Sequence, residues 1–235
     1  MALPPKAEKT HERKRGSGAQ YVYDVLRNEI LDLTLAPGRP IDEIQLSERL
    51  EMSRTPIREA LVRLAGEGLV TTLPNRSTVV TTIDFLNLHT FFDAMTLMYR
   101  VTTRLAAEDH RKTDLEAIRA RQVEFAAAVS AQDALAMIAT NREFHAAIAV
   151  AGRNQYYEAL CLRLLDEGRR LLRLYYSSFD DRLPQEYVAE HEDMIAAIEA
   201  RDVPRADALA SAHADQIVNQ IRAMISRDRR QKIAL

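Results

Sequence analysis

Three histidines and one asparagine have the residue types and the spacing of a metal site. Asn141 and His145 lie four residues apart in the run N-R-E-F-H, which places both side chains on one face of a helix. His191 and His213 occur in later helix-like segments, and all three histidines belong to apolar stripes. Imidazole nitrogens from several helices of a bundle can converge on one divalent ion, such as Zn²⁺ or Ni²⁺. The alternative is that each histidine is a hydrogen-bonded core residue without a ligand.

A second set of residues has the chemistry of DNA recognition. Arg54 and Arg58 lie four apart in the segment Ser53–Val70, which reads SRTPIREALVRLAGEGLV. A guanidinium presents a planar fork of donors that matches guanine edges and phosphates in a major groove. The same arginines could instead be solvated side chains on the polar face of an ordinary amphipathic helix.

The sequence around these arginines predicts a helix-turn-helix. Apolar residues recur there at helical spacing, namely Ile57, Ala60, Leu61 and Leu64. Ser53 or Thr55 can cap this helix, Pro56 is tolerated in its first turn, and Gly68 is suited to end it. Residues 43–50 predict a shorter helix, so only a tight turn at 51–52 separates the two.

Flanking segments complete a winged helix over residues 19–82. Helical spacing predicts a first helix over 19–33, whereas residues 69–73 and 78–82 read as two strands joined by a turn. Residues 1–18 are rich in Lys, Arg, Gly and Pro, and they predict a disordered basic arm.

The remainder of the chain, residues 84–229, predicts an all-helical bundle. Asp84 can cap the first helix, and helix-like apolar spacing covers residues 85–110, 113–131, 133–151, 155–179, 184–200 and 203–229. The connections are short, so consecutive helices are expected to be antiparallel neighbours. The predicted fold class is therefore mainly α, with an N-terminal winged helix-turn-helix and a C-terminal antiparallel bundle.

Composition narrows the class of protein. The 235 residues have a formal net charge of −2, and the first 82 are only slightly basic, so DNA affinity must come from individually placed arginines. Cys161 is the only cysteine, which excludes an intrachain disulfide. The N-terminal segment lacks the apolar run of a signal peptide, and no run is long enough to cross a bilayer. A cytoplasmic protein is expected.

Residues 21–82 resemble the DNA-binding domain of the GntR family of transcription regulators. The resemblance rests on Ala36-Pro37-Gly38, LSERL (Leu46–Leu50), SRTPIREAL (Ser53–Leu61), EGLV (Glu67–Val70) and Pro74-Asn75-Arg76. It implies that a winged helix contacts double-stranded DNA through matching positions, which are Ser53, Arg54, Thr55, Arg58, Asn75 and Arg76. Three departures concern the details of binding: Ile44 replaces a frequent arginine, and Glu51 and Ser77 replace frequent glycines.

Residues 84–228 resemble the FCD-type effector-binding domain of the FadR branch of that family. The signatures are the Phe-His pair before Gly152-Arg153-Asn154, the run HEDMIAAIEARD (His191–Asp202), and a late helix with a histidine. The resemblance implies a divalent metal bound by Asn141, His145, His191 and His213. An asparagine at the first of these positions, where aspartate is common, is expected to weaken the hold on the ion.

The same resemblance identifies two candidate effector-pocket residues, Met95 and Tyr99. Met95 replaces an arginine that pairs with carboxylate effectors in many relatives, and Tyr99 replaces a frequent glutamate. These residues predict a more apolar or aromatic pocket wall for a small metabolite, with an organic acid as the family precedent. Plain core packing is the alternative for both.

Together these features predict a homodimeric, ligand-responsive repressor that binds an inverted-repeat operator. A variant hypothesis keeps the DNA binding but makes the metal purely structural, or makes it the signal. The alternative from another class is a helical metallohydrolase with an accessory winged helix. A hydrolytic metal site needs a general base beside a bound water, and Glu143 and Glu192 are expected to point away from the histidines.

Overall fold

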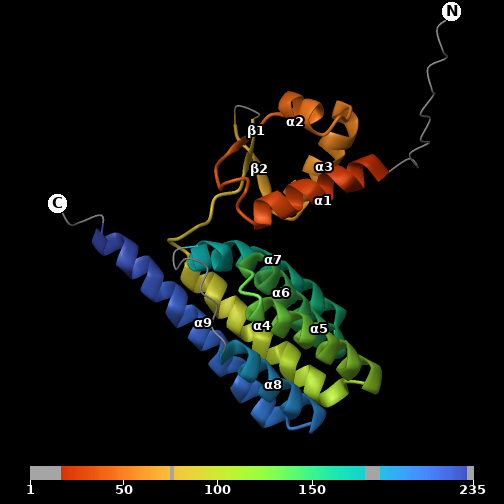
Figure 1. Ribbon diagram of the computed structural model, residues 1–235, viewed down its shortest axis with the longest axis vertical. Helices are drawn as coiled ribbons and strands as arrows, with labels where there is room; N and C mark the ends of the chain where they lie inside the picture. Colours follow the sequence, from red (N-terminus) through yellow and green to blue (C-terminus); the bar gives the residue numbers. More distant parts are fainter. Residues whose placement is uncertain (1–16, 75–76, 178–185, 232–235) are drawn as a thin grey trace, which may run out of the picture. The chain divides into compact units, whose positions relative to one another are not determined.

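A computed structural model describes residues 17–74, 77–177 and 186–231 of the chain. The chain divides into two compact units, the first made of residues up to Ile30 with Leu35–Thr82, the second of Leu31–Thr34 with residues from Ile83 onward (Figure 1). Most described residues are helical and the strands are confined to the first unit, which confirms the predicted fold class.

The described residues of the first unit form three helices and a small antiparallel sheet. The helices are α1 (Ser17–Leu31), α2 (Glu43–Arg49) and α3 (Arg54–Gly66), and the strands are β1 (Pro40–Ile41), β2 (Val70–Thr72) and β3 (Thr78–Val80). The strand order is β1-β3-β2, with Val79 opposite both Pro40 and Thr71. The apolar faces of α1 and α3 supply the core, including fully buried Leu26, Ile30, Ile57 and Leu64.

Local interactions fix the helix-turn-helix geometry. The Asp42 carboxylate accepts hydrogen bonds from the amides of Ile44 and Gln45 and so caps α2. Glu51 adopts a left-handed conformation (φ 52°) in the turn, at a cost of about 1–2 kcal/mol. Gly68, at φ 75°, follows the end of α3 as predicted.

Several predicted boundaries in this unit were wrong. Helix α1 begins at Ser17, inside the predicted arm, and ends at Leu31 rather than at residue 33. Ser53 occupies the N-cap position of α3, but its hydroxyl makes no capping hydrogen bond. The strand β1 was not predicted, since it has two residues and depends on pairing with β3. The predicted wing-tip residues Asn75 and Arg76 lie outside the described residues.

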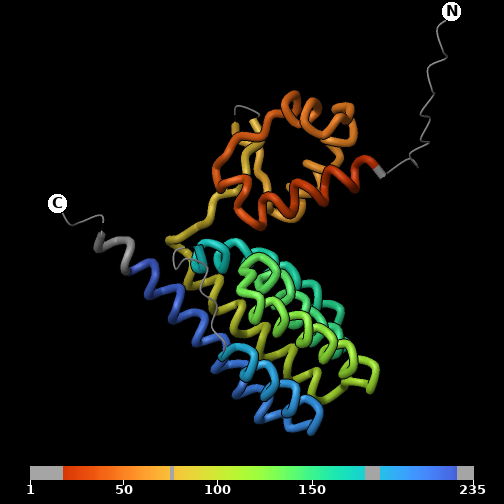
Figure 2. The backbone as a smooth tube through the Cα atoms, viewed as in Figure 1, coloured from red at the N-terminus to blue at the C-terminus, as the bar shows by residue number. Residues whose placement is uncertain are grey.

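The second unit is a bundle of long helices around α4. These helices are α4 (Leu88–Asp109), α5 (Lys112–Ser130), α6 (Ala134–Ala151), α7 (Gln155–Ser177), α8 (Glu186–Glu199) and α9 (Val203–Gln231). Helix α4 packs against α6, α7, α8 and α9, and α5 packs against α6 and α8 (Figure 2). Because α6, α8 and α9 all approach α4, side chains from distant parts of the sequence can meet in the bundle interior.

Tight left-handed turns connect the antiparallel helices. Gln132, Arg153 and Arg201 follow α5, α6 and α8 with φ near 55°, so the chain reverses within a few residues. The predicted helix start near Asp84 was wrong. The Asp84 carboxylate accepts hydrogen bonds from the backbone amides of Leu86 and Asn87 in a separate turn. Helix α4 begins only at Leu88. Helix α9 extends beyond the predicted limit at 229.

Within the described residues, none of the helices combines the length and the apolar character needed to cross a membrane.

Candidate functional site

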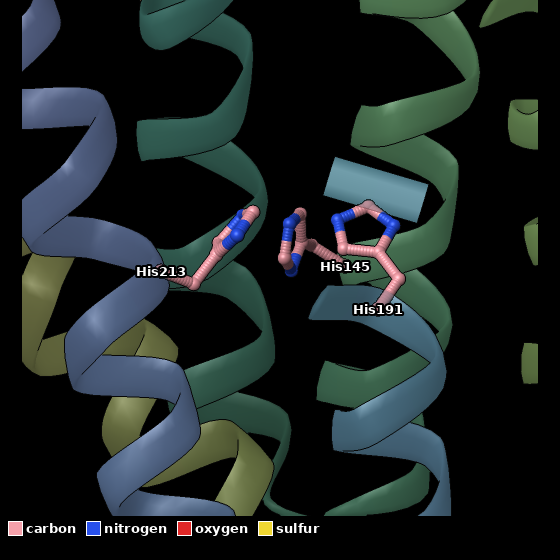
Figure 3. A group of neighbouring side chains, drawn as sticks. All are labelled: His145, His191 and His213. Atoms are coloured by element: carbon pink, nitrogen blue, oxygen red, sulfur yellow. The ribbon is translucent and has the colours of Figure 1, made fainter. Parts of the chain in front are cut away.

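The three predicted metal-binding histidines meet inside the second unit. His145 on α6, His191 on α8 and His213 on α9 are 3%, 0% and 2% exposed. One ring nitrogen from each lies within 4.8 Å of those of the other two. Figure 3 shows the three rings side by side between the helices that carry them. Side chains 68 residues apart in sequence thus form one compact cluster.

The electronic state of these rings suits a cation. The Nε2 atoms of all three histidines are buried and have no hydrogen-bond partner among the described residues. Burial lowers the pKa of His145 and His191 well below the ordinary value, and the neighbouring His213 lowers both further. A neutral imidazole offers a lone pair, and a buried polar atom without a partner costs about 1–3 kcal/mol. A divalent ion would satisfy these atoms, so the residues fit a metal.

Asn141 lies one helical turn before His145 and is buried. Burial raises the pKa of the Tyr99 hydroxyl, and the neighbouring Asn141 side chain opposes part of this rise. Asn141 shares its helix face with His145, as predicted.

Tyr99 separates the histidine cluster from an apolar cavity. Its ring stacks on His145 with centroids 4.3 Å apart, and it also lines a cavity of about 40 Å³. The lining residues are Phe91, Phe92, Met95, Thr96, Tyr99, Gly168, Leu171, Leu172, Ala214, Ile217, Val218 and Ile221. None of these side chains is charged, and only Thr96 and Tyr99 carry polar atoms. Both predicted pocket residues, Met95 and Tyr99, therefore line the same apolar space.

Of the acidic residues close to the histidines in sequence, some are exposed to solvent and one contacts the histidine cluster. Glu143 and Glu192 are exposed, and Glu143 pairs with Arg142 at 2.9 Å. Glu190 Oε2, in contrast, lies 2.6 Å from His213 Nδ1. Glu190 was not predicted as a site residue, although it directly precedes His191.

Gln122 was also missed. Its Oε1 lies 3.1 Å from His191 Nδ1. The available signal was a polar residue in the apolar stripe of α5, between buried Ile118 and Phe125.

The predicted DNA-contacting residues of α3 form an exposed group at its N-terminal end. Ser53, Arg54, Thr55 and Arg58 are all exposed, whereas the apolar stripe of the helix is buried. The Arg58 side chain is 62% exposed, and its Nε donates to Glu43 Oε2 at 2.9 Å. An exposed ion pair of this kind leaves the guanidinium accessible to DNA.

The Arg63 side chain instead contacts residues of α1 in the same domain. Its guanidinium lies 3.8 Å from the centroid of the Tyr23 ring and donates to Gln20. Arg63 therefore belongs to the packing of α1 against α3.

Comparison with known proteins decides the family. The FCD domain family matches residues 91–216, more than half of the chain, and the family described as bacterial regulatory proteins of the gntR family matches residues 18–80. The chain belongs to the GntR family and carries an FCD domain. This GntR/FCD protein is a DNA-binding transcriptional regulator and not an enzyme, which removes the metallohydrolase alternative.

Full-length relatives of the GntR/FCD protein support this assignment. It is 24% identical over 205 residues to the HTH-type transcriptional repressor RspR of Escherichia coli (strain K12), covering 86% of this chain and 88% of the relative. It is 29% identical over 197 residues to the Nta operon transcriptional regulator of Aminobacter aminovorans, covering 81% and 90%. The structure of E. coli McbR/YncC has the same fold, with a TM-score of 0.78, 21% identity, and coverage of 89% of this chain and 99% of that one.

Proposed function

We propose that this regulator is a homodimeric repressor of the FadR branch that releases an inverted-repeat operator when a small organic ligand binds in its FCD domain. A divalent metal held by Asn141, His145, His191 and His213 would form one end of the ligand site. Ser53, Arg54, Thr55 and Arg58 would contact the operator from α3, with Asn75 and Arg76 at the wing. Repression is also the role named for the relative RspR.

The observation that carries the ligand site is the set of three buried Nε2 atoms that have no hydrogen-bond partner in the described part of the chain. When bound, the metal would supply a Lewis-acidic centre for oxygen donors of a ligand. The protein donors in this set are imidazoles and an amide, with no anionic ligand among them, so the centre would keep the positive charge of the ion. Such a centre favours an anionic oxygen ligand, such as a carboxylate.

The cavity beyond Tyr99 suggests the rest of the ligand. Its lining is aliphatic and aromatic, with hydroxyls only from Thr96 and Tyr99. We therefore expect a monocarboxylate with an apolar body rather than a dicarboxylate, because a second carboxylate would be buried there without a cationic partner. The cavity is small, so side chains such as Met95 must move to admit a ligand.

Dimerisation is supported by exposed apolar side chains on two neighbouring helices of the bundle. Leu97 on α4 and Tyr156 and Leu160 on α7 are each more than half exposed, and α4 packs against α7. Exposed large apolar side chains on adjacent helices are typical of an interface between subunits. Sedimentation equilibrium of the full chain should give a dimer, and Leu160→Glu should shift it toward monomer.

The functional test separates the two sites by substitution. Arg58→Ala should weaken binding to a selected operator duplex by about 1–3 kcal/mol per half-site while metal binding is unchanged. His191→Ala should abolish metal binding while leaving the operator affinity of the ligand-free protein intact. The proposal is wrong if His191→Ala still responds to a metabolite that releases the wild-type protein.

A structural metal is the second candidate, because the histidine rings are almost completely buried. Chelation would then lower the melting temperature without changing either operator affinity or the response to metabolites. A change in operator affinity with metal alone would instead identify the ion as the signal.

A further inference from the structure

The Nδ1 atoms of two cluster histidines are held by hydrogen bonds, and these bonds determine which tautomer each ring adopts. His191 Nδ1 lies 3.1 Å from Gln122 Oε1, and His213 Nδ1 lies 2.6 Å from Glu190 Oε2. A neutral imidazole carries one proton, so the nitrogen that faces an acceptor must hold it, and the other nitrogen presents a lone pair.

The orientation of Gln122 is fixed from its other end. Gln122 Nε2 donates to the backbone carbonyl of Val188 at 3.0 Å. A carbonyl oxygen can only accept, so the amide must direct its N–H toward Val188 and its Oε1 toward His191. His191 therefore donates from Nδ1, and its Nε2 carries the lone pair. Gln122 is 2% exposed, so water does not compete for this arrangement.

Glu190 acts in the same sense on His213. An ionised carboxylate only accepts hydrogen bonds, so His213 must place a proton on Nδ1. The Glu190 side chain is 28% exposed and the His213 side chain 2% exposed, so the carboxylate reaches the ring from the solvated side of the cluster.

Both constraints have the same result at the centre of the cluster. In the rings of His191 and His213, Nε2 is the nitrogen that is buried and has no hydrogen-bond partner among residues 17–74, 77–177 and 186–231. In each of these rings the proton is therefore on Nδ1, and Nε2 carries the lone pair. Glu190 thus contacts His213 on the side of the ring opposite Nε2, where the hydrogen-bond partner of a metal-binding histidine lies.

We propose that Gln122 and Glu190 are positioning residues that hold His191 and His213 in the Nδ1–H tautomer, so that both Nε2 lone pairs face the metal. This inference rests on the proposed metal site for its function, but the tautomers themselves can be observed without metal.

The test uses the full chain, labelled with ¹⁵N-histidine and treated with chelator, followed by titration with Zn²⁺. Nitrogen NMR of the wild type should show Nδ1–H tautomers for His191 and His213. Gln122→Leu should remove this preference for His191, and Glu190→Gln should weaken it for His213. Each substitution should also weaken Zn²⁺ binding by about 10–100-fold.

Two controls keep the outcomes distinct. Glu192→Gln removes the same charge from an exposed position on α8 and should leave both the tautomers and Zn²⁺ affinity unchanged. Gln122→Glu retains an acceptor toward His191 Nδ1 and should preserve the Nδ1–H tautomer, unlike Gln122→Leu.

The inference is overturned if either wild-type ring is found in the Nε2–H tautomer, or if Gln122→Leu and Glu190→Gln bind Zn²⁺ as tightly as Glu192→Gln. A wild-type protein that shows the Nδ1–H tautomers but binds no divalent ion would overturn the proposed metal function alone.

Discussion

The ion pair between Arg58 and Glu43 leads to a specific prediction about operator affinity. Arg58 on α3 is a proposed DNA contact, and in the free protein its Nε donates to the Glu43 carboxylate on α2 at 2.9 Å. A phosphate or guanine acceptor must compete with this carboxylate for the guanidinium. We predict that Glu43→Gln, which removes the charge and keeps the shape, increases operator affinity.

The exposure of the two groups sets the size of the effect. The Arg58 and Glu43 side chains are 62% and 34% exposed, so the pair belongs with surface ion pairs, which contribute about 0.2–1 kcal/mol. The proposed homodimer would carry this pair in each of its two winged helices. The total of about 0.4–2 kcal/mol corresponds to roughly a 2- to 30-fold decrease in dissociation constant.

Fluorescence anisotropy with a labelled operator duplex measures this change, at low and at physiological salt. Glu48→Gln is the matched control, because it removes the same charge from an exposed position on the same helix. Both variants reduce general repulsion from the phosphates, but only Glu43→Gln also releases Arg58. The gain of Glu43→Gln over Glu48→Gln should shrink as salt is raised.

The reasoning is refuted if Glu43→Gln binds the operator no more tightly than Glu48→Gln. Weaker binding by Glu43→Gln would show that the carboxylate holds Arg58 in its DNA-reading orientation.

Three further predictions concern packing and reactivity. Gly152→Ala should lower the unfolding free energy by about 1–3 kcal/mol in thermal denaturation, since a Cβ there would lie 2.9 Å from Leu105 Cβ and 3.3 Å from the Thr102 carbonyl oxygen; an unchanged melting temperature would contradict this. Cys161 should resist thiol reagents at pH 8 until the protein unfolds, because burial raises the pKa of its thiol to about 11; alkylation of the folded chain at the rate of a free thiol would count against it. Arg63→Ala should cost about 0.5–1 kcal/mol of stability, through the lost contact with the Tyr23 ring, without changing operator affinity; a loss of DNA binding in a stable variant would make Arg63 a DNA contact.

Periodicity was sufficient to predict most elements of the fold. The stripe of Ile57, Ala60, Leu61 and Leu64 predicted α3, and these side chains are buried as expected. Gly68 marked the end of that helix because a left-handed residue is needed there. Such signals are local, so a single sequence contains them.

Features that depend on distant contacts were harder to predict. The short strand β1 exists through its pairing with β3, and Asp84 looked like a helix cap although it closes a turn of its own. Spacing alone placed Asn141 and His145 on one helix face, but the meeting of His145 with His191 and His213 depends on how α6, α8 and α9 pack. The apolar stripes around the three histidines left a shared site open as one of two interpretations, and the family resemblance favoured it.

The pairing of each histidine with its hydrogen-bond partner could not be predicted from the sequence. Gln122 comes from α5 and contacts a ring on α8, and Glu190 on α8 contacts a ring on α9. Neither pairing has a sequence period, since each is set by the tertiary arrangement of two helices.

X-ray absorption spectroscopy of the full chain with one equivalent of Zn²⁺ or Ni²⁺ tests most directly whether the buried rings of α6, α8 and α9 form one metal centre. We predict one tightly held ion per chain, with scattering from three imidazole ligands and the remaining ligands being oxygen. A spectrum with only oxygen ligands, or an ion removed by simple desalting, would contradict a metal centre built from His145, His191 and His213.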